Sequence, residues 1–205
     1  MASANNHPGQ TAAIRRALRS ERLALREAMS AAEHRHASAL IERHLYELLG
    51  ARAGGCIGFC WPMRGEFDPR ALVGGLLKRG WQACMPVVET PGAAMVFHAW
   101  QPTSEMRHGP HGTVVPAEAH PALPDVLLLP LVAFDPAGFR LGYGGGYFDR
   151  TLAALRPRPL TVGVGFELAR TETIHPAAHD IPLEVIVTEA GISRPSHKIA
   201  HASLG

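Results

Sequence analysis

A glycine-rich stretch, "AGFRLGYGGGYFDR" at residues 137–150, carries the residue types best suited to hold a phosphate. Glycines let the backbone approach an anion and direct consecutive N–H groups at it, and a helix that follows adds partial positive charge. Arg140 can contact phosphate oxygens, and Asp149 is a hard carboxylate of the kind that binds Mg²⁺. A tight structural turn explains the glycines but neither charged residue. The pattern therefore favours a magnesium–nucleotide site, although Tyr147 breaks the G-x-G-x-x-G motif.

Four arginines near the N-terminus repeat at helical spacing. Arg15, Arg19, Arg22 and Arg26 follow one another at steps of four, three and four, which places them on one face of a helix over residues 11–30. A solvated charged face accounts for this pattern, and the spacing alone favours that interpretation for Arg22 and Arg26. Lysine occurs only at positions 78 and 198. We therefore expect a phosphate ligand in this chain to be a guanidinium or a backbone N–H.

Other polar residues have simpler explanations. His175 and His179 form an H-x3-H pair, but Pro176 opposes a helix that would bring them together. We expect loop histidines there rather than metal ligands. Asp125 and Asp135 flank an apolar run, where aspartate commonly caps turns.

Apolar spacing and capping residues indicate the helices that must position these groups. The clearest helix begins with a capping box of Ser30 and Glu33 and ends at Gly50. A shorter one has Asp68 as its N-cap and Pro69 as its first helical residue. The expected helices cover residues 11–30, 30–50, 69–80 and 147–155.

Apolar runs predict strands between the helices. The run 126–134 is continuously apolar, which is typical of a strand covered on both faces, and residues 101–124 predict an irregular segment. Alternating strands and helices indicate an α/β fold, a layered sheet flanked by helices, in a single domain over residues 11–192. Residues 1–10 and 193–205 are expected to be disordered tails. The expected strands cover residues 55–61, 81–88, 94–100, 126–134, 160–166 and 184–190.

Several of these segments together resemble one enzyme family. The stretch "FDPAGFRLGYGGGYFDRTL" is similar to the signature of the 5-formyltetrahydrofolate cyclo-ligase (5,10-methenyltetrahydrofolate synthetase) family. The segments "RRALR", "WPMRGEFDPRAL", "MPVV…AMVFHAW" and "IHPAAHDIPLEVIVTE" resemble further elements of that family in order and spacing, over about residues 11–190. The resemblance implies a fold like that of the NagB, RpiA and CoA transferase proteins.

The resemblance also implies the residues of the site. ATP is expected to contact Arg15, Arg16, Ala17, Leu18, Arg19, Arg140, Leu141, Gly142, Tyr143, Gly144, Gly145, Gly146, Tyr147 and Phe148. The folate is expected to contact Trp61, Glu66, Tyr143, Gly144, Gly145, Gly146 and Tyr147. Asp149 and Asp180 are expected to bind Mg²⁺, and Arg140 and Tyr147 to act in catalysis. From the residues alone, Trp61 can equally belong to the core and Glu66 can be a solvated charge.

The implied reaction converts 5-formyltetrahydrofolate and ATP to 5,10-methenyltetrahydrofolate, ADP and phosphate. A formamide is a poor electrophile because its nitrogen donates electrons to the carbonyl. Phosphorylation of the formyl oxygen creates an electrophilic carbon with a good leaving group, and N10 of the folate then attacks that carbon. The protein contributes positioning and charge stabilisation.

The sequence departs from the family pattern at three positions and leaves two alternatives open. Arg15 stands where lysine is usual, Val115 where glutamate is common and Ala169 where glutamine is frequent. A non-catalytic nucleotide- or folate-binding relative is therefore one alternative. A sugar-phosphate isomerase or CoA transferase of the same fold is another, and such an enzyme would not need ATP.

Composition limits the partners and the location. The 205 residues carry a formal net charge of +2, which does not suggest a nucleic-acid-binding protein. No apolar run approaches the roughly 20 residues of a membrane span, and the first residues lack the pattern of a secretory signal. Three cysteines, Cys56, Cys60 and Cys84, suit buried free thiols in a reducing compartment better than disulfides or zinc. We expect a cytoplasmic monomer with small-molecule substrates.

Overall fold

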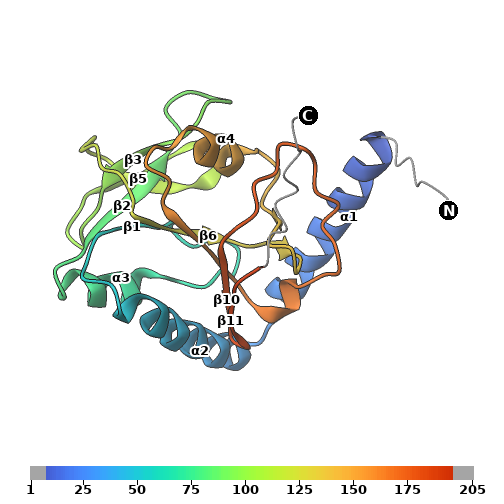
Figure 1. Cartoon of the computed structure of the whole chain (residues 1–205), viewed down its shortest axis with the longest axis horizontal. Coiled ribbons are helices and arrows are strands. Elements are labelled where there is room, and N and C mark those ends of the chain that lie inside the picture. Colours follow the sequence, from blue (N-terminus) through green and yellow to red (C-terminus); the bar gives the residue numbers. More distant parts are fainter. Residues whose placement is uncertain (1–7, 196–205) are drawn as a thin grey trace, which may run out of the picture.

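A computed structural model describes residues 8–195. The chain forms a central sheet with helices on both sides (Figure 1). The helices are α1 (Pro8–Glu27), α2 (Ala31–Gly50), α3 (Arg70–Leu77) and α4 (Tyr147–Ala154), with short 3-10 turns η1 (Pro110–Gly112) and η2 (Glu167–Ala169). The strands are β1 (Cys56–Gly58), β2 (Gln82–Val87), β3 (Val96–Ala99), β4 (Met106–His108), β5 (Val114–Pro116), β6 (Val126–Pro130), β7 (Ala133–Phe134), β8 (Arg140–Leu141), β9 (Leu160–Val164), β10 (Val185–Thr188) and β11 (Gly191–Ser193).

The sheet is mostly parallel and has seven strands. Their order is β11-β10-β9-β6-β1-β2-β3, in which β10, β9, β6, β1 and β2 run parallel and the two edge strands run antiparallel to their neighbours. Two small hairpins, β4–β5 and β7–β8, stand outside this sheet. The expected layered α/β sheet flanked by helices is confirmed.

The core has two layers because successive strand residues point to opposite faces of the sheet. On β6, Val126 and Leu128 pack in the cluster that includes Ile41 and Leu45 of α2, whereas Leu127 and Leu129 pack on the other face with Leu152 of α4. Helices α2 and α3 therefore cover one face and α4 the other (Figure 1). Helix α1 packs at one end of the molecule, against η2 and β7.

The predicted capping box and turn-capping aspartates are confirmed, whereas the predicted N-cap of α3 is displaced by one residue. The capping box is present, since the Ser30 hydroxyl accepts from the Glu33 N–H and the Glu33 carboxylate accepts from the Ser30 N–H. Asp125 and Asp135 bind backbone N–H groups, as turn-capping aspartates do. Asp68 also binds a backbone N–H, that of Arg70, but the N-cap of α3 is Pro69 and not Asp68.

Some boundaries differ from expectation. The apolar run 126–134 is divided into β6 and β7, because the chain leaves the sheet after Pro130 and pairs β7 with β8. The segment 101–124 contains the β4–β5 hairpin rather than only irregular chain. The tails expected at 1–10 and 193–205 lie largely outside the described residues, while α1 already begins at Pro8 and β11 ends at Ser193.

The cysteines are unpaired. Cys56 and Cys84 are buried and Cys60 is half-buried, beyond the end of β1, so the strand expected over residues 55–61 is shorter than the sequence indicated. No helix within residues 8–195 is long and apolar enough to cross a membrane.

Candidate active site

The glycine stretch forms a tight loop between β8 and the first turn of α4. Gly144 and Gly146 have φ angles of +102° and +64°, in the region that favours glycine, and Gly146 is the N-cap of α4. A Cβ on Gly145 would lie 2.8 Å from the ring of Tyr147. The fold itself therefore favours glycine at these three positions. It does not require glycine at position 142, because the φ of Gly142 is not positive and a Cβ there would meet nothing within 4 Å.

Arginines of α1 approach this loop from one side. The Arg19 Nε donates to the Gly142 carbonyl at 2.7 Å, and a Cβ on Gly144 would lie 3.6 Å from the Arg19 guanidinium. Burial, and then the charges of Arg15 and Arg16, lower the pKa of Arg19. Such a concentration of positive charge beside exposed backbone suits a polyanion.

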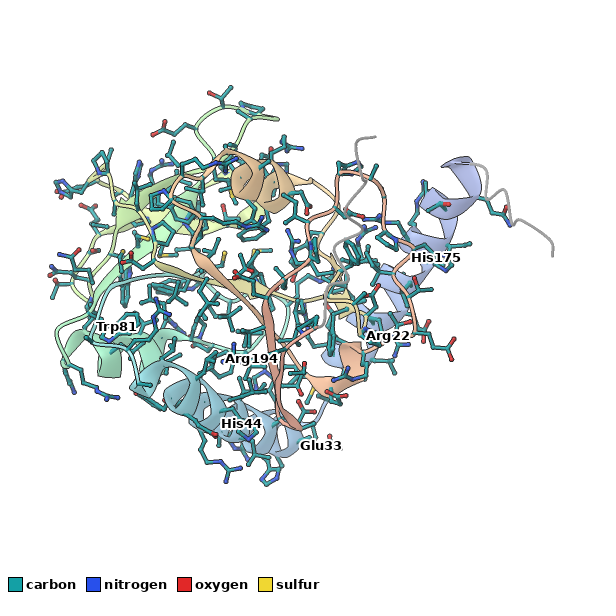
Figure 2. All side chains as sticks on the ribbon, in the orientation of Figure 1. Arg22, Glu33, His44, Trp81, His175 and Arg194 are labelled. Carbon is teal, nitrogen blue, oxygen red and sulfur yellow. The ribbon has the colours of Figure 1, made fainter. Side chains whose placement is uncertain are left out.

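The whole arginine stripe faces protein, so the expectation that Arg22 and Arg26 are solvated is wrong. Figure 2 shows Arg22 on the side of the molecule where α1 lies; its Nη1 donates to the Leu168 carbonyl in η2 at 2.9 Å. Arg26 is only 5% exposed and donates to the Leu131 carbonyl at 3.0 Å. A charged stripe has the same spacing whether it contacts water or protein carbonyls, so the sequence could not tell the two apart.

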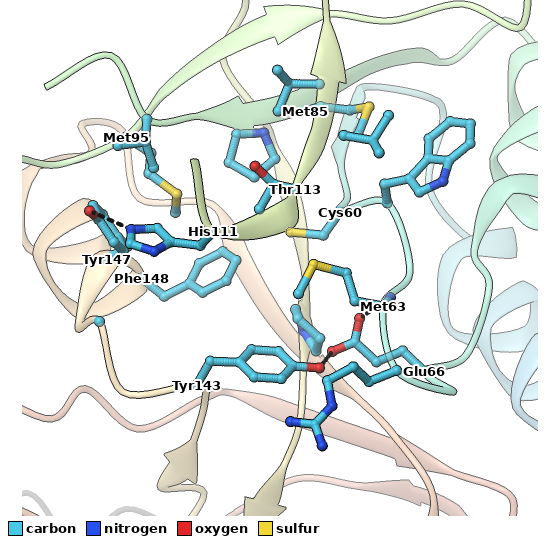
Figure 3. Close-up of a pocket in the computed structure, with 18 residues that line it drawn as sticks. Cys60, Met63, Glu66, Met85, Met95, His111, Thr113, Tyr143, Tyr147 and Phe148 are labelled. Carbon is cyan, nitrogen blue, oxygen red and sulfur yellow. Dashed lines mark hydrogen bonds between the residues drawn. The ribbon is translucent and has the colours of Figure 1, made fainter. Parts of the chain in front are cut away.

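A cavity of about 570 Å³ is lined in part by Tyr143 and Gly145 of this loop (Figure 3). Its walls come from the loop after β1, from β2, from the β4–β5 hairpin and from the first turn of α4. Most of the lining is apolar and includes three methionines. Five of the residues expected to contact folate line it together, namely Trp61, Glu66, Tyr143, Gly145 and Tyr147.

Glu66 and Tyr143 form a buried polar pair at this cavity. The Tyr143 hydroxyl donates to Glu66 Oε1 at 2.7 Å, and Glu66 Oε2 accepts from the Met63 N–H at 2.9 Å. Burial raises the pKa of Glu66, an effect that the bonds from Tyr143 and Met63 and the charge of Arg26 oppose. Burial and the neighbouring Glu66 carboxylate raise the pKa of Tyr143. Glu66 is thus not the solvated charge that its sequence context also allowed.

A second polar pair lies elsewhere on the cavity wall. His111 Nε2 and the Tyr147 hydroxyl are 3.3 Å apart, and Figure 3 shows this pair on a different side of the cavity from Glu66. His111 belongs to the turn of the β4–β5 hairpin and has a positive φ of 59°. Sequence reasoning missed it because three-residue strands give too little periodicity to recognise a hairpin.

The neighbouring wall bears on two departures from the family pattern. Val115, where the family commonly has glutamate, presents an apolar side chain to the cavity. Ala169 is buried in η2, away from the cavity lining.

Trp61 both lines the cavity and packs against the core, with the Arg70 guanidinium 4.3 Å from its ring centroid. Burial raises the pKa of the nearby Cys60 thiol.

The acidic candidates are already engaged with arginines. Asp149 Oδ1 accepts from Arg140 Nη1 and from the Ile181 N–H, both at 3.1 Å. Arg140 is buried and does not line the cavity, and burial lowers its pKa despite the neighbouring Asp149. Both oxygens of Asp180 accept from Arg15, and Oδ2 also accepts from the Ala177 N–H.

The charge state of Asp180 follows from these contacts. Burial raises the pKa of Asp180, but the bonds from Arg15 and Ala177 outweigh it, and the net shift is downward. His175 and His179 lie in the loop before Asp180, as expected, and the Arg15 Nη1 also donates to the His175 carbonyl at 3.3 Å. Within the part of the chain that the structure describes, no three His, Cys, Asp or Glu side chains gather as a metal site.

Comparisons of the whole chain with known proteins agree on one family. Residues 11–189 match the model of the 5-formyltetrahydrofolate cyclo-ligase family. The 5-formyltetrahydrofolate cyclo-ligase of Haemophilus influenzae is 28% identical over 82% of this chain and 94% of that protein. The enzyme of that name from Escherichia coli K12 is 33% identical over 62% of this chain and 74% of its own length. The solved structure of Aquifex aeolicus 5,10-methenyltetrahydrofolate synthetase is 29% identical, with a TM-score of 0.76, over 92% of this chain and 99% of that one.

Proposed function

The chain belongs to the 5-formyltetrahydrofolate cyclo-ligase family, and on that premise we propose that it cyclises 5-formyltetrahydrofolate to 5,10-methenyltetrahydrofolate at the expense of ATP. One observation carries the proposal. The same glycine loop is bonded by Arg19 at Gly142 and lines an apolar cavity with Tyr143 and Gly145. A polyanion beside the arginines and a heterocycle in the cavity, with its polar edge toward the buried polar groups, would meet at this loop.

The proposed reaction begins with a phosphoryl transfer between the two bound substrates. The formyl oxygen of the substrate takes the γ-phosphoryl group of ATP, and ADP leaves. N10 then attacks the formyl carbon, N10 loses its proton, and the C–O bond to phosphate breaks as the methenyl cation forms. Because the step is a phosphoryl transfer, the protein needs mainly to align the two substrates and to neutralise charge.

The residues take roles that suit these steps. Backbone N–H groups of Gly142 to Gly146 would hold the phosphates, with Arg15, Arg16 and Arg19 as cations on the same side. Tyr143, Tyr147, Trp61 and Glu66 would contact the folate from the cavity walls. Arg140, buried beside Asp149, would add positive charge beneath the loop and keep that carboxylate oriented.

The acidic residues fit magnesium unequally. Mg²⁺ in nucleotide sites is typically held by phosphates and one or two carboxylates, and it neutralises phosphate charge. Within the described residues Asp149 Oδ2 accepts no hydrogen bond, whereas both oxygens of Asp180 are bound by Arg15. We therefore propose Asp149 as the protein ligand and assign Asp180, expected from the sequence to be a second one, to the orientation of Arg15.

A direct assay tests the proposal. The protein is incubated with 5-formyltetrahydrofolate with and without MgATP, and the near-ultraviolet absorbance of the methenyl product and the release of ADP are followed. We expect both to depend on ATP. Turnover without ATP would favour an isomerase or transferase of the same fold, and binding of folate without ADP release would favour a non-catalytic relative. A monomeric state and a cytoplasmic location stay predictions.

A further inference from the structure

Arg26 lies in the last turn of α1 and is buried. Its three guanidinium nitrogens each contact a different segment. Nε donates to the Arg64 carbonyl at 3.0 Å, Nη1 to the Leu131 carbonyl at 3.0 Å and Nη2 to the Tyr143 hydroxyl at 2.8 Å. One side chain thus joins the loop after β1, the chain just beyond β6 and the glycine loop. Neither the family resemblance nor the arginine spacing assigned it a part in the site.

The charge of Arg26 is matched by one carboxylate. Arg26 Nη2 lies 3.8 Å from Glu66 Oε1, and both side chains are less than a tenth exposed. The adjacent Arg64 is engaged at the surface by Glu27 instead, with both side chains more than 40% exposed. Buried charges are stable only when they are paired and hydrogen-bonded, so Arg26 and Glu66 depend on each other.

The Tyr143 hydroxyl completes a chain of contacts between them. It accepts from Arg26 and donates to Glu66 Oε1, which leaves it no freedom to rotate its proton elsewhere. Glu66 Oε2 is fixed by the Met63 N–H. Arg26 itself does not line the cavity, whereas Glu66 and Tyr143 both do. The guanidinium therefore acts on the cavity through its neighbours.

We propose that Arg26 is a positioning residue for the folate: it holds the Glu66 carboxylate charged and oriented, together with the Tyr143 hydroxyl, at one wall of the cavity. This proposal rests on the proposed function, because it presumes that the cavity receives folate. Glu66 is the carboxylate among the residues that line the cavity, so it is the group that can accept from ring N–H donors of the substrate. Without Arg26 that buried carboxylate would lose its charged partner and keep only the bonds from Tyr143 and Met63.

The groups around Glu66 set its pKa and hence the pH at which folate binding would change. Arg26 approaches from α1 and Tyr143 from the glycine loop. The Cys60 thiol lies in the same wall, and from α2 His34 Nε2 contacts the Glu66 carbonyl at 3.3 Å. Arg26 is the positive charge that lowers the pKa of Glu66. Its removal should raise that pKa further, so folate affinity should begin to fall at a higher pH on acidification.

The test compares Arg26→Gln with the matched control Arg22→Gln. Arg22 lies on the same helix face and also donates to a backbone carbonyl, but it does not reach Glu66 or Tyr143. The wild-type protein must first show ATP-dependent turnover, since failure there would refute the proposed function and not the role of Arg26. We then expect Arg26→Gln to raise the folate KM and Kd roughly tenfold or more, with the ATP KM changed less than twofold. Arg22→Gln should leave both KM values unchanged.

Two further variants separate charge from geometry and guard against misfolding. Arg26→Lys keeps the charge but has fewer donors, so it should raise the folate KM while keeping the wild-type pH dependence. Tyr143→Phe keeps Arg26 and removes the hydroxyl, and it should weaken folate binding even if Arg26→Gln does not fold. Equal increases in both KM values, or a lower melting temperature with unchanged folate Kd in Arg26→Gln and Tyr143→Phe, would overturn the proposal.

Discussion

Asp149 and Asp180 differ in what already occupies their oxygens, and at the scale of single residues that difference separates their roles. Asp149 uses one oxygen for Arg140 and the Ile181 N–H, and within the described residues its other oxygen accepts no hydrogen bond. Asp180 uses both oxygens for Arg15. A divalent cation needs a lone pair that is not committed to a guanidinium, so the two carboxylates should respond differently to Mg²⁺.

We predict that Asp149→Asn and Asp180→Asn differ in a titration of Mg²⁺ at fixed ATP. A carboxamide is a weak magnesium ligand, so Asp149→Asn should need more Mg²⁺ for half-maximal turnover. Asp180→Asn should instead raise the ATP KM, because Arg15 loses its charged partner, with little change in the Mg²⁺ requirement. Identical Mg²⁺ titrations for the two variants would contradict the assignment.

At the scale of elements, the glycine loop has two kinds of glycine. Those at 144 and 146 adopt positive φ angles, and a Cβ at 145 would strike the Tyr147 ring. Gly142 meets neither constraint, yet its carbonyl is the atom that Arg19 holds. A glycine that the fold itself does not require is explained if a ligand approaches the backbone at that point.

This contrast predicts opposite outcomes for two alanine substitutions. Gly142→Ala should leave the melting temperature near that of the wild type but raise the ATP KM, because its Cβ would stand where phosphate approaches. Gly144→Ala should cost about 1–2 kcal/mol of stability from its positive φ. Thermal unfolding and ATP titration of both variants check this. Unchanged ATP affinity in Gly142→Ala would remove the best reason to place phosphates on this loop.

The β4–β5 hairpin supplies the other polar wall of the cavity. His111→Phe keeps an aromatic ring beside Tyr147 but loses the contact between Nε2 and the hydroxyl. We expect the folate KM to rise a few-fold, in keeping with the loss of one hydrogen bond, and the ATP KM to stay the same. Thr113→Val, in the same hairpin and also at the cavity wall, keeps the His111 side chain but removes the bond from the Thr113 hydroxyl to the Pro110 carbonyl, so it shows what a change in the turn alone does. A change in the ATP KM alone would place His111 on the nucleotide side instead.

The sequence predicted best those features whose partners lie within a few residues, and it missed contacts with distant parts of the chain. Ser30 and Glu33 cap α2 through bonds within a single turn, and the alternation of Val126 to Leu129 follows from strand geometry. The burial of Arg26 depends on carbonyls and a hydroxyl more than 30 residues away in the chain. Nothing in a helical stripe of arginines encodes those partners. The sequence thus predicted the loop and its charged neighbours as one group, whereas only the fold shows which of them line the cavity and which contact α1.

At the scale of the whole molecule, α1 touches both sides of the site. Arg19 holds Gly142 on the arginine side, and Arg26, seven residues and about 10 Å further along the helix, holds Tyr143 on the cavity side. Consecutive residues of one loop are thus tied to a single rigid helix. A shift of α1 on nucleotide binding would be transmitted to the cavity through both contacts, and linkage makes such coupling reciprocal.

We therefore predict that nucleotide strengthens folate binding and that this coupling passes through Arg19. Folate Kd can be followed by the fluorescence of Trp61 at the cavity wall, with and without a non-hydrolysable ATP analogue. For the wild type we expect the analogue to lower the folate Kd about fivefold or more, within the usual range of coupling between sites. Arg19→Gln should keep the folate Kd measured without nucleotide, because Arg26 still holds Tyr143, but it should lose the increase in affinity at saturating analogue. Arg22→Gln should behave as the wild type in both conditions. A wild-type folate Kd that the analogue does not change would show that the two sides of the loop bind independently and that α1 serves only to anchor it.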